Sequence, residues 1–236
     1  MRILISRALI ARVGWERLPR GVRRLEAMDL LALVAAADRI GIVAFALSGV
    51  AVGMRARMDL FGLAALGLVT AIGGGVMREV VIGDVPRAFV TTDYLLFAVG
   101  ATVVGILAGS RGWESPEAIH RAADAVGTGA FGATGALLAA QAGLGWPAAV
   151  LLGILTATGG GVIRDLLSDQ VPRVLHSEMN ATAAACGGAL TFILRGDPTL
   201  AAVLGGAVGA IISGLGHSGL LRLPKPGVQR DADTPE

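Results

Sequence analysis

The sequence is poor in charge and almost free of cysteine. Charged residues make up 16% of its 236 residues, against about 25% in an average globular protein. The single cysteine, Cys186, cannot form a disulfide bridge within the chain. Apolar residues reach 54%, and the mean hydropathy is +0.69. This composition excludes a disordered chain, a nucleic-acid-binding domain and a secreted disulfide scaffold, and it indicates an integral membrane protein.

Seven apolar windows are candidates for membrane-spanning helices, each of which needs about 20 mostly apolar residues. None shows the period-2 alternation of a barrel strand. The charge-free stretch at 125–163 is long enough for two spans, and its Gly- and Pro-containing segment at 142–147 divides it. The other spans are expected at 40–54 with an upstream extension from residue 30, 60–77, 94–110, 179–194 and 198–221. We therefore expect an all-α fold of seven transmembrane helices.

An internal repeat becomes visible when the chain is shifted by 86 residues. Chance supplies scattered Gly and Ala matches in so biased a composition, but it does not place two motifs in one register. Because each copy holds three spans, the second copy must enter the membrane from the opposite side. The sequence thus predicts two inverted three-helix repeats followed by a seventh helix. The matching motifs are GGGV at 73–76 and 159–162, Arg78 and Arg164, and VPR at 85–87 and 171–173.

The repeat and its flanks divide the chain into five segments. An Arg-rich extension at 1–27 is either an interfacial segment or a start that is not native. Lys and Arg concentrate in the loops on the side of the C-terminus, which predicts an outside N-terminus and a cytoplasmic C-terminus, although the arginines of 1–27 argue the reverse. The remaining segments are the first repeat at 28–110, the second at 111–195, the seventh helix at 196–223 and a polar tail at 224–236.

Three consecutive glycines occur in the second span and again in the fifth. Each glycine costs about 1 kcal/mol relative to alanine inside a helix. Paired glycine-interrupted spans point to a substrate or ion site near the membrane midplane, whereas close helix packing is the alternative reason for small residues. We favour broken helices that line a pathway. The residues concerned are Gly73, Gly74, Gly75, Gly159, Gly160 and Gly161.

A basic and an acidic residue follow each glycine triplet, as Arg78–Glu79 and Arg164–Asp165. Apolar residues come next in both copies, so the pairs are expected inside the membrane, where ionisable groups mark function. We expect charge pairs that take part in gating. The alternative is an arginine that extends to the interface while tied to its neighbouring acid.

Polar residues also recur in the first and fourth spans, as an acid followed ten residues later by a hydroxyl. Ten residues are close to three helical turns, so both side chains face one direction and line one cavity. Helix capping and bonding to the local backbone are an equally supported alternative. These residues are Asp38, Ser48, Asp124 and Thr134. We expect Phe45 and Phe131 to be core residues.

The sequence shows no metal-ligand spacing, nucleophile elbow or phosphate loop, because GGGVMRE lacks the Gly-Lys-Ser/Thr ending. We therefore expect no metal site, no cofactor and no enzymatic activity.

The motifs GGGVMRE…DVPRAF and GGGVIRD…QVPRVL, set within seven spans, resemble those of the prokaryotic trimeric intracellular cation channels. This family has also been catalogued as a putative glycine transporter domain. The resemblance covers about residues 28 to 221. It implies a homotrimer in the bacterial inner membrane, with one K⁺- and Na⁺-conducting pore per protomer lined by helices that bend at their glycines. In animal members a basic cluster near the second bend binds a phosphoinositide, and Arg164 matches part of that cluster.

The function expected from the sequence is a K⁺-permeable channel for monovalent cations, with membrane lipid and further copies of the chain as its partners. Two alternatives stay open. One is a secondary transporter for a small amino acid such as glycine, because inverted repeats with broken helices are common in transporters. The other is a non-conducting scaffold whose glycines serve only helix packing.

Overall fold

The computed structural model describes residues 20–111, 117–175 and 179–221, and every regular element within them is helical. The predicted all-α fold is confirmed for these residues. The helix α2 begins at Arg20 and therefore runs across the segment boundary expected at residues 27 and 28. The elements are α2 (Arg20–Arg55), α3 (Leu60–Ile82), α4 (Arg87–Val90), α5 (Thr92–Ser110), α6 (Glu117–Gln141), α7 (Trp146–Leu167), η2 (Arg173–Leu175), α8 (Asn180–Ile193) and α9 (Pro198–His217).

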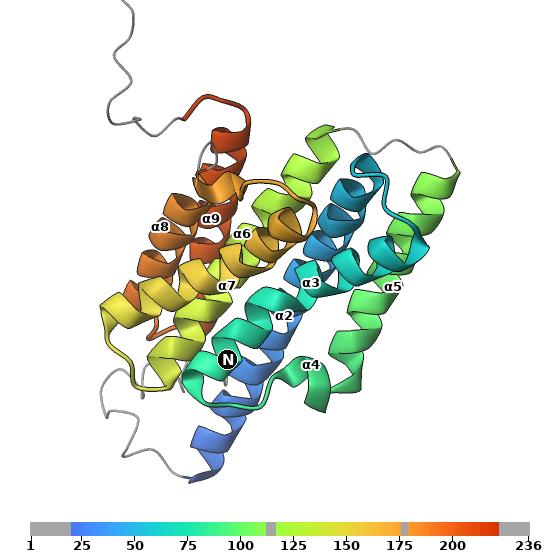
Figure 1. The fold of residues 1–236 in the computed structure, drawn as a ribbon. Helices are drawn as coiled ribbons and strands as arrows, with labels where there is room; N and C mark the ends of the chain where they lie inside the picture. The colour runs from blue at the N-terminus through green and yellow to red at the C-terminus, as the bar shows by residue number, and fades with distance from the viewer. Residues whose placement is uncertain (1–19, 112–116, 176–178, 222–236) are drawn as a thin grey trace, which may run out of the picture.

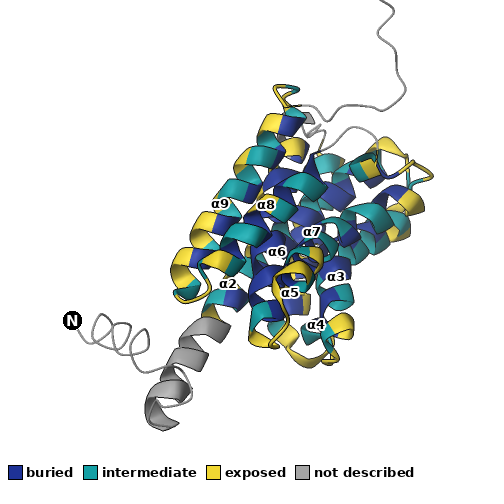
Figure 2. Ribbon diagram, turned by 90° about the vertical axis from the view of Figure 1, so that its left-hand side faces the viewer, coloured by how far each residue is buried: buried dark blue, intermediate teal, exposed yellow. Residues whose placement is uncertain are grey.

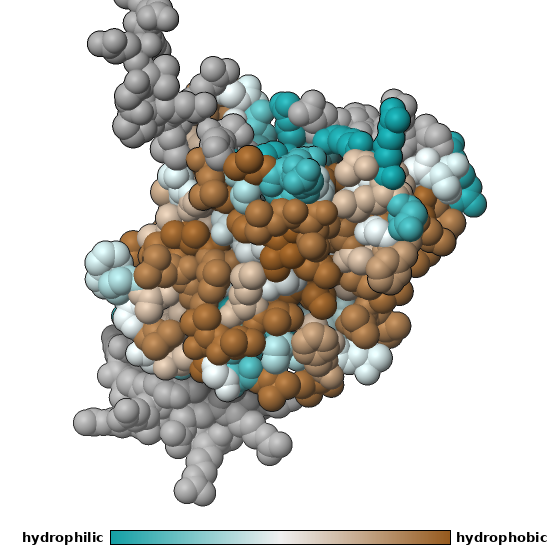
Figure 3. Space-filling model, viewed as in Figure 1, coloured by the Kyte–Doolittle hydropathy of each residue, from teal (hydrophilic) through white to brown (hydrophobic). Residues whose placement is uncertain are grey.

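Five of the described helices are long and apolar enough to cross a membrane: α2 from Ala32, α3, α5, α7 and α9. The helix α8 is apolar but has only 14 residues. The helix α6 has 25 residues and a length of about 38 Å. It carries Asp124 and Thr134, the acid and hydroxyl of the second repeat. Apolar side chains cover most of the face drawn in Figure 3, with hydrophilic residues gathered toward its top edge. The protein is an integral membrane protein, and seven crossings remain the prediction.

The helices α3 and α7 lie side by side in the middle of the molecule, with α5 on one side and α8 and α9 on the other (Figure 1). Buried residues concentrate where these central helices meet α2 and α6, and exposed residues lie on the outer helices and at the loops (Figure 2). Phe45 of α2 and Phe131 of α6 are both buried, and their ring centroids lie 5.3 Å apart. Both are core residues, as predicted.

The helices α3 and α7 are each followed by a residue in the left-handed conformation, and these two residues are 86 positions apart. Gly83 follows α3 with a φ of 91°, and Asp169 lies just beyond α7 with a φ of 57°. The next backbone N–H in each copy bonds back to the carbonyl of the acid in the Arg–acid pair, from Asp84 to Glu79 at 2.9 Å and from Gln170 to Asp165 at 2.8 Å. Such left-handed residues close a helix end by satisfying its free carbonyls. After each turn the chain reverses direction and passes next to the buried Arg–acid pair of the helix that it follows.

The predicted interruption of the two central helices is wrong, because α3 and α7 are helical through residues 73–75 and 159–161. The glycines remove side chains where the helices touch. A Cβ atom on Gly74 would overlap the carbonyl oxygen of Thr156, and a Cβ on Gly160 would overlap that of Thr70. The structure therefore supports the packing alternative, in which glycine lets two membrane helices approach backbone to backbone.

We predict that Gly74→Ala and Gly160→Ala each lower the thermal stability of the purified protein. The added methyl group meets backbone atoms that cannot rotate away, and overpacking of this kind costs about 1–3 kcal/mol. Thermal unfolding in detergent measures the effect. Gly214→Ala in α9 is the control, because a Cβ there meets nothing within 4 Å. Equal melting temperatures for all three variants would contradict the backbone contact.

Candidate functional site

The first repeat buries an arginine among four oxygen-bearing side chains. Arg78 of α3 is 1% exposed, and its guanidinium donates to both carboxylate oxygens of Asp38 on α2 at 2.9 Å. It also donates to Glu79 Oε1 at 2.9 Å and to Thr134 Oγ1 on α6 at 3.1 Å. Tyr94 Oη donates to Asp38 Oδ2 at 3.3 Å. A bidentate arginine–carboxylate pair with further hydrogen bonds is the arrangement that makes a buried charge tolerable.

The second repeat builds the same arrangement around Arg164 of α7, which is also 1% exposed. Its guanidinium donates to Asp124 Oδ1 on α6 at 2.7 Å and to Asp165 Oδ1 at 2.8 Å. It also donates to Ser48 Oγ on α2 at 2.5 Å. The nitrogen Nδ2 of Asn180 donates to Asp124 Oδ2 at 3.4 Å, from the position that Tyr94 holds in the first repeat. The predicted pairs of each arginine with its neighbouring acid are present, and neither arginine extends to the surface.

The polar residues of α2 and α6 are divided between the two clusters. Asp38 joins the Arg78 cluster, whereas Ser48 on the same helix joins the Arg164 cluster. Likewise, Asp124 bonds Arg164 and Thr134 bonds Arg78. In this arrangement each acid and its hydroxyl therefore belong to different clusters and do not share the one cavity that was expected. Ten residues rise about 15 Å along a helix, so the two groups face one direction at different depths.

A second arginine completes each cluster and comes from the VPR motif. The backbone N–H of Arg87 donates to Glu79 Oε2 at 2.6 Å, and that of Arg173 donates to Asp165 Oδ2 at 3.0 Å. Their side chains lie within ion-pair distance of the same acids, at 3.4 and 3.6 Å. Each cluster thus contains two arginines and two carboxylates, with a formal charge of zero. This role was not predicted, although the repeated VPR motif, with its arginine eight residues after each acid, is a signal for it in the sequence.

Two polar residues belong to the second cluster alone. His120 of α6 is buried, with Nδ1 3.2 Å from Ser48 Oγ, and its equivalent in the first repeat is Val34. On the other side, Ser213 of α9 donates to Asn180 Oδ1 at 2.5 Å, which links the last helix to the second cluster. Neither residue could be predicted from the repeat, because His120 corresponds to an apolar valine and Ser213 lies on the last helix, outside both repeats.

Each cluster borders a small hollow. The hollow of the first repeat is lined by Arg78, Gly75 and Phe131 among others, and that of the second by Arg164, Gly161 and Phe45 among others. Each has a volume of about 10 Å³, room for about one water molecule. Because Phe131 borders one hollow, Phe45 borders the other and the two rings are in contact, the aromatic pair lies between them.

The donor set of the clusters does not suit a metal ion. Among the residues that the structure describes, no group of three or more His, Cys, Asp and Glu side chains could hold one. The carboxylates of both clusters are occupied by arginines.

The fold and the clusters define a helical membrane protein made of two repeats, each with a buried arginine. A family model described as glycine transporter matches residues 35–109 and 121–196, one match per repeat. The chain is 39% identical over 160 residues to a UPF0126 membrane protein of Deinococcus radiodurans, covering 66% of this chain and 74% of that protein. It is 37% identical over 153 residues to the UPF0126 inner membrane protein YadS of Escherichia coli K12, covering 64% and 73%.

Two solved structures share the fold. One, described as the structural basis for conductance through TRIC cation channels, has a TM-score of 0.75 and 33% identity, covering 83% of this chain and 98% of that one. The other is the TRIC trimeric intracellular cation channel orthologue from Rhodobacter sphaeroides, with a TM-score of 0.73 and 34% identity, covering 80% and 98%. The chain belongs to the prokaryotic trimeric intracellular cation channel family, to which the glycine transporter model corresponds. These relatives are described as membrane proteins and channels, not as enzymes.

We predict that Arg164→Met destabilises the protein by about 3–5 kcal/mol, because it leaves Asp124 as an unpaired buried charge. The double variant Arg164→Met/Asp124→Asn removes both charges and leaves the Asp165–Arg173 pair, so it recovers part of that loss. Thermal or denaturant unfolding in detergent measures the difference. Arg111→Met, at the exposed end of α5, is the control. A double variant no more stable than Arg164→Met would show that this charge pair does not control stability.

Proposed function

We propose that the protein is a K⁺-permeable channel for monovalent cations, with one pore in each protomer of a homotrimer. The observation that carries this proposal is the likeness to two solved structures described as cation channels, at 33% and 34% identity over 83% and 80% of the chain. One of those two is described as trimeric. The chain is an integral membrane protein with a relative described as an inner membrane protein, which supports the inner membrane as its location.

The proposed pore passes both charge clusters, with α3 lining it at the first cluster and α7 lining it at the second. The two hollows support this path, because one is bordered by Gly75 and the other by Gly161, from the two glycine triplets. Asp38 and Asp124 supply carboxylate oxygens at the two levels. In this path the glycine triplets at 73–75 and 159–161 form the pore wall without a break in either helix.

A pore that contains two buried arginines conducts cations only if their charges are neutralised. Arg78 and Arg164 each bind two carboxylates and a hydroxyl, so a passing cation meets clusters with a formal charge of zero. The oxygens of Ser48 and Thr134 provide uncharged ligands at the same levels. Opening then requires the Phe45–Phe131 pair and the glycine contacts to separate, while the Arg–acid pairs hold the helices in register.

Transport of a small amino acid such as glycine is the alternative, and the description of the family model is its support. We do not favour it, because both solved structures are described as cation channels. From the loop charges we also propose an outside N-terminus and a cytoplasmic C-terminus.

Recording from the purified protein in planar bilayers with asymmetric KCl tests the proposal. We expect discrete openings that reverse near the equilibrium potential of K⁺. Silence over many incorporations, together with saturable glycine uptake into liposomes, would instead support the transporter.

We predict that Phe45→Ala and Phe131→Ala increase K⁺ current severalfold, because each removes one of the two rings that lie between the hollows. Single-channel conductance and open probability in the same bilayers measure the effect. Phe61→Ala is the matched control, since this ring at the start of α3 is 81% exposed. Unchanged currents in both core variants would place the constriction elsewhere.

A further inference from the structure

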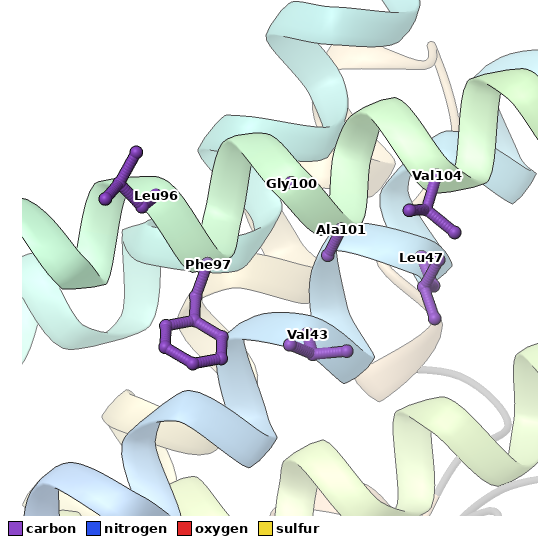
Figure 4. Close-up of a pocket in the computed structure, with 7 residues that line it drawn as sticks. All are labelled: Val43, Leu47, Leu96, Phe97, Gly100, Ala101 and Val104. Carbon is purple, nitrogen blue, oxygen red and sulfur yellow. The ribbon is translucent and has the colours of Figure 1, made fainter.

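An apolar groove lies on the outer surface between α2 and α5, away from both charge clusters. Its volume is about 400 Å³. Val43 and Leu47 of α2 form one side, and side chains of α5, among them Phe97 and Val104, form the other (Figure 4). Nothing in the pore proposed above uses this groove.

A charged pair continues the two rows of apolar residues beyond one end of the groove. Arg39 lies one helical turn before Val43, and Asp93 lies one turn before Phe97. Arg39 donates to Asp93 Oδ2 through Nε at 3.0 Å and also through Nη2. Its guanidinium carbon lies 5.7 Å from the ring centroid of Phe97, one of the residues that line the groove. The apolar groove therefore ends at an arginine that is paired with an aspartate.

The charged pair lies where α5 enters the membrane. Asp93 is the second residue of the span Thr92–Ser110, and the groove extends from there toward the middle of that span. Val104 is about 16 Å farther along the helix than Asp93. Both charged side chains are 34% exposed, so they remain reachable at the level where lipid headgroups meet the hydrocarbon core.

We propose that this groove binds a phospholipid of the bilayer, with the phosphate on Arg39 and one acyl chain along the groove. Guanidinium groups form strong charge-assisted hydrogen bonds with phosphate. Asp93 engages Nε and Nη2, which leaves Nη1 outside that pair to donate to a phosphate oxygen. The pairing with Asp93 also fixes the guanidinium over Phe97, so little side-chain freedom is lost on binding.

The lining and the end of the groove together suit a phospholipid. Its walls carry only apolar side chains and glycine, and it ends at the Arg39–Asp93 pair. Gly100 lines the groove from α5, and a Cβ atom there meets nothing within 4 Å. The open space in front of this glycine accepts a slender flexible chain.

Two variants block the proposed site in different ways. Gly100→Leu fills the groove without a clash, and its control is Gly214→Leu in α9, where a Cβ also meets nothing within 4 Å. Arg39→Gln removes the phosphate donor, and its control is Arg111→Gln at the far end of α5. Because each blocking variant changes only one part of the site, failure of one to fold leaves the other as the test.

The measurement is binding of a phosphatidylglycerol or phosphatidylethanolamine to the delipidated full chain, followed by native mass spectrometry and by the shift in melting temperature. We expect binding by the unaltered protein and both controls. Affinity should be at least about tenfold weaker in Arg39→Gln, as loss of a charge-assisted hydrogen bond implies, and weaker also in Gly100→Leu, because the leucine occupies the place of the acyl chain. Inorganic phosphate alone and a fatty acid alone are expected to bind more weakly than the phospholipid.

Equal lipid binding by Gly100→Leu and its control would overturn the proposal. So would dissociation of the oligomer in Gly100→Leu with lipid binding unchanged, because the groove would then be an interface between copies of the chain. The readout does not involve ion flux, so its outcome is independent of whether the protein conducts K⁺.

Discussion

Neutralisation of two arginines at membrane depth is the constraint on which the rest of this structure depends. An unpaired guanidinium away from water is too costly to retain, so Arg78 and Arg164 each require carboxylates from two helices. Those contacts hold α3 against α2 and α7 against α6. The VPR turns then bring a further backbone amide to each remaining acid. The short connections after α3 and α7 are thus part of the buried network.

The glycine triplets complement this network. Because Gly74 and Gly160 allow the backbones of α3 and α7 to touch, Arg78 can reach Thr134 and Arg164 can reach Ser48 in the opposite repeat. With larger residues the central helices would stand farther apart, and each guanidinium would lose its hydroxyl partner. Close packing of α3 against α7 and burial of the two arginines therefore depend on the same helix crossing.

Much of the fold could be predicted from the sequence, because the apolar windows and the 86-residue offset are local or linear signals. The pairing of Arg78 with Glu79 and of Arg164 with Asp165 was predictable for the same reason. The partners that each arginine finds on other helices were not predictable. Which arginine Asp38 or Ser48 reaches depends on how α2 packs against α3 and α6 in three dimensions. The glycine triplets led to the wrong prediction of broken helices. The sequence shows that glycine disfavours a helix, but only the structure shows the carbonyls of Thr70 and Thr156 that face Gly160 and Gly74.

The exchange of hydroxyls makes the two halves of the chain depend on each other. Thr134 of the second half bonds the arginine of the first, and Ser48 of the first half bonds the arginine of the second. A half with only three helices would keep its buried arginine but lose the hydroxyl that bonds it. Neither half alone therefore satisfies its own guanidinium.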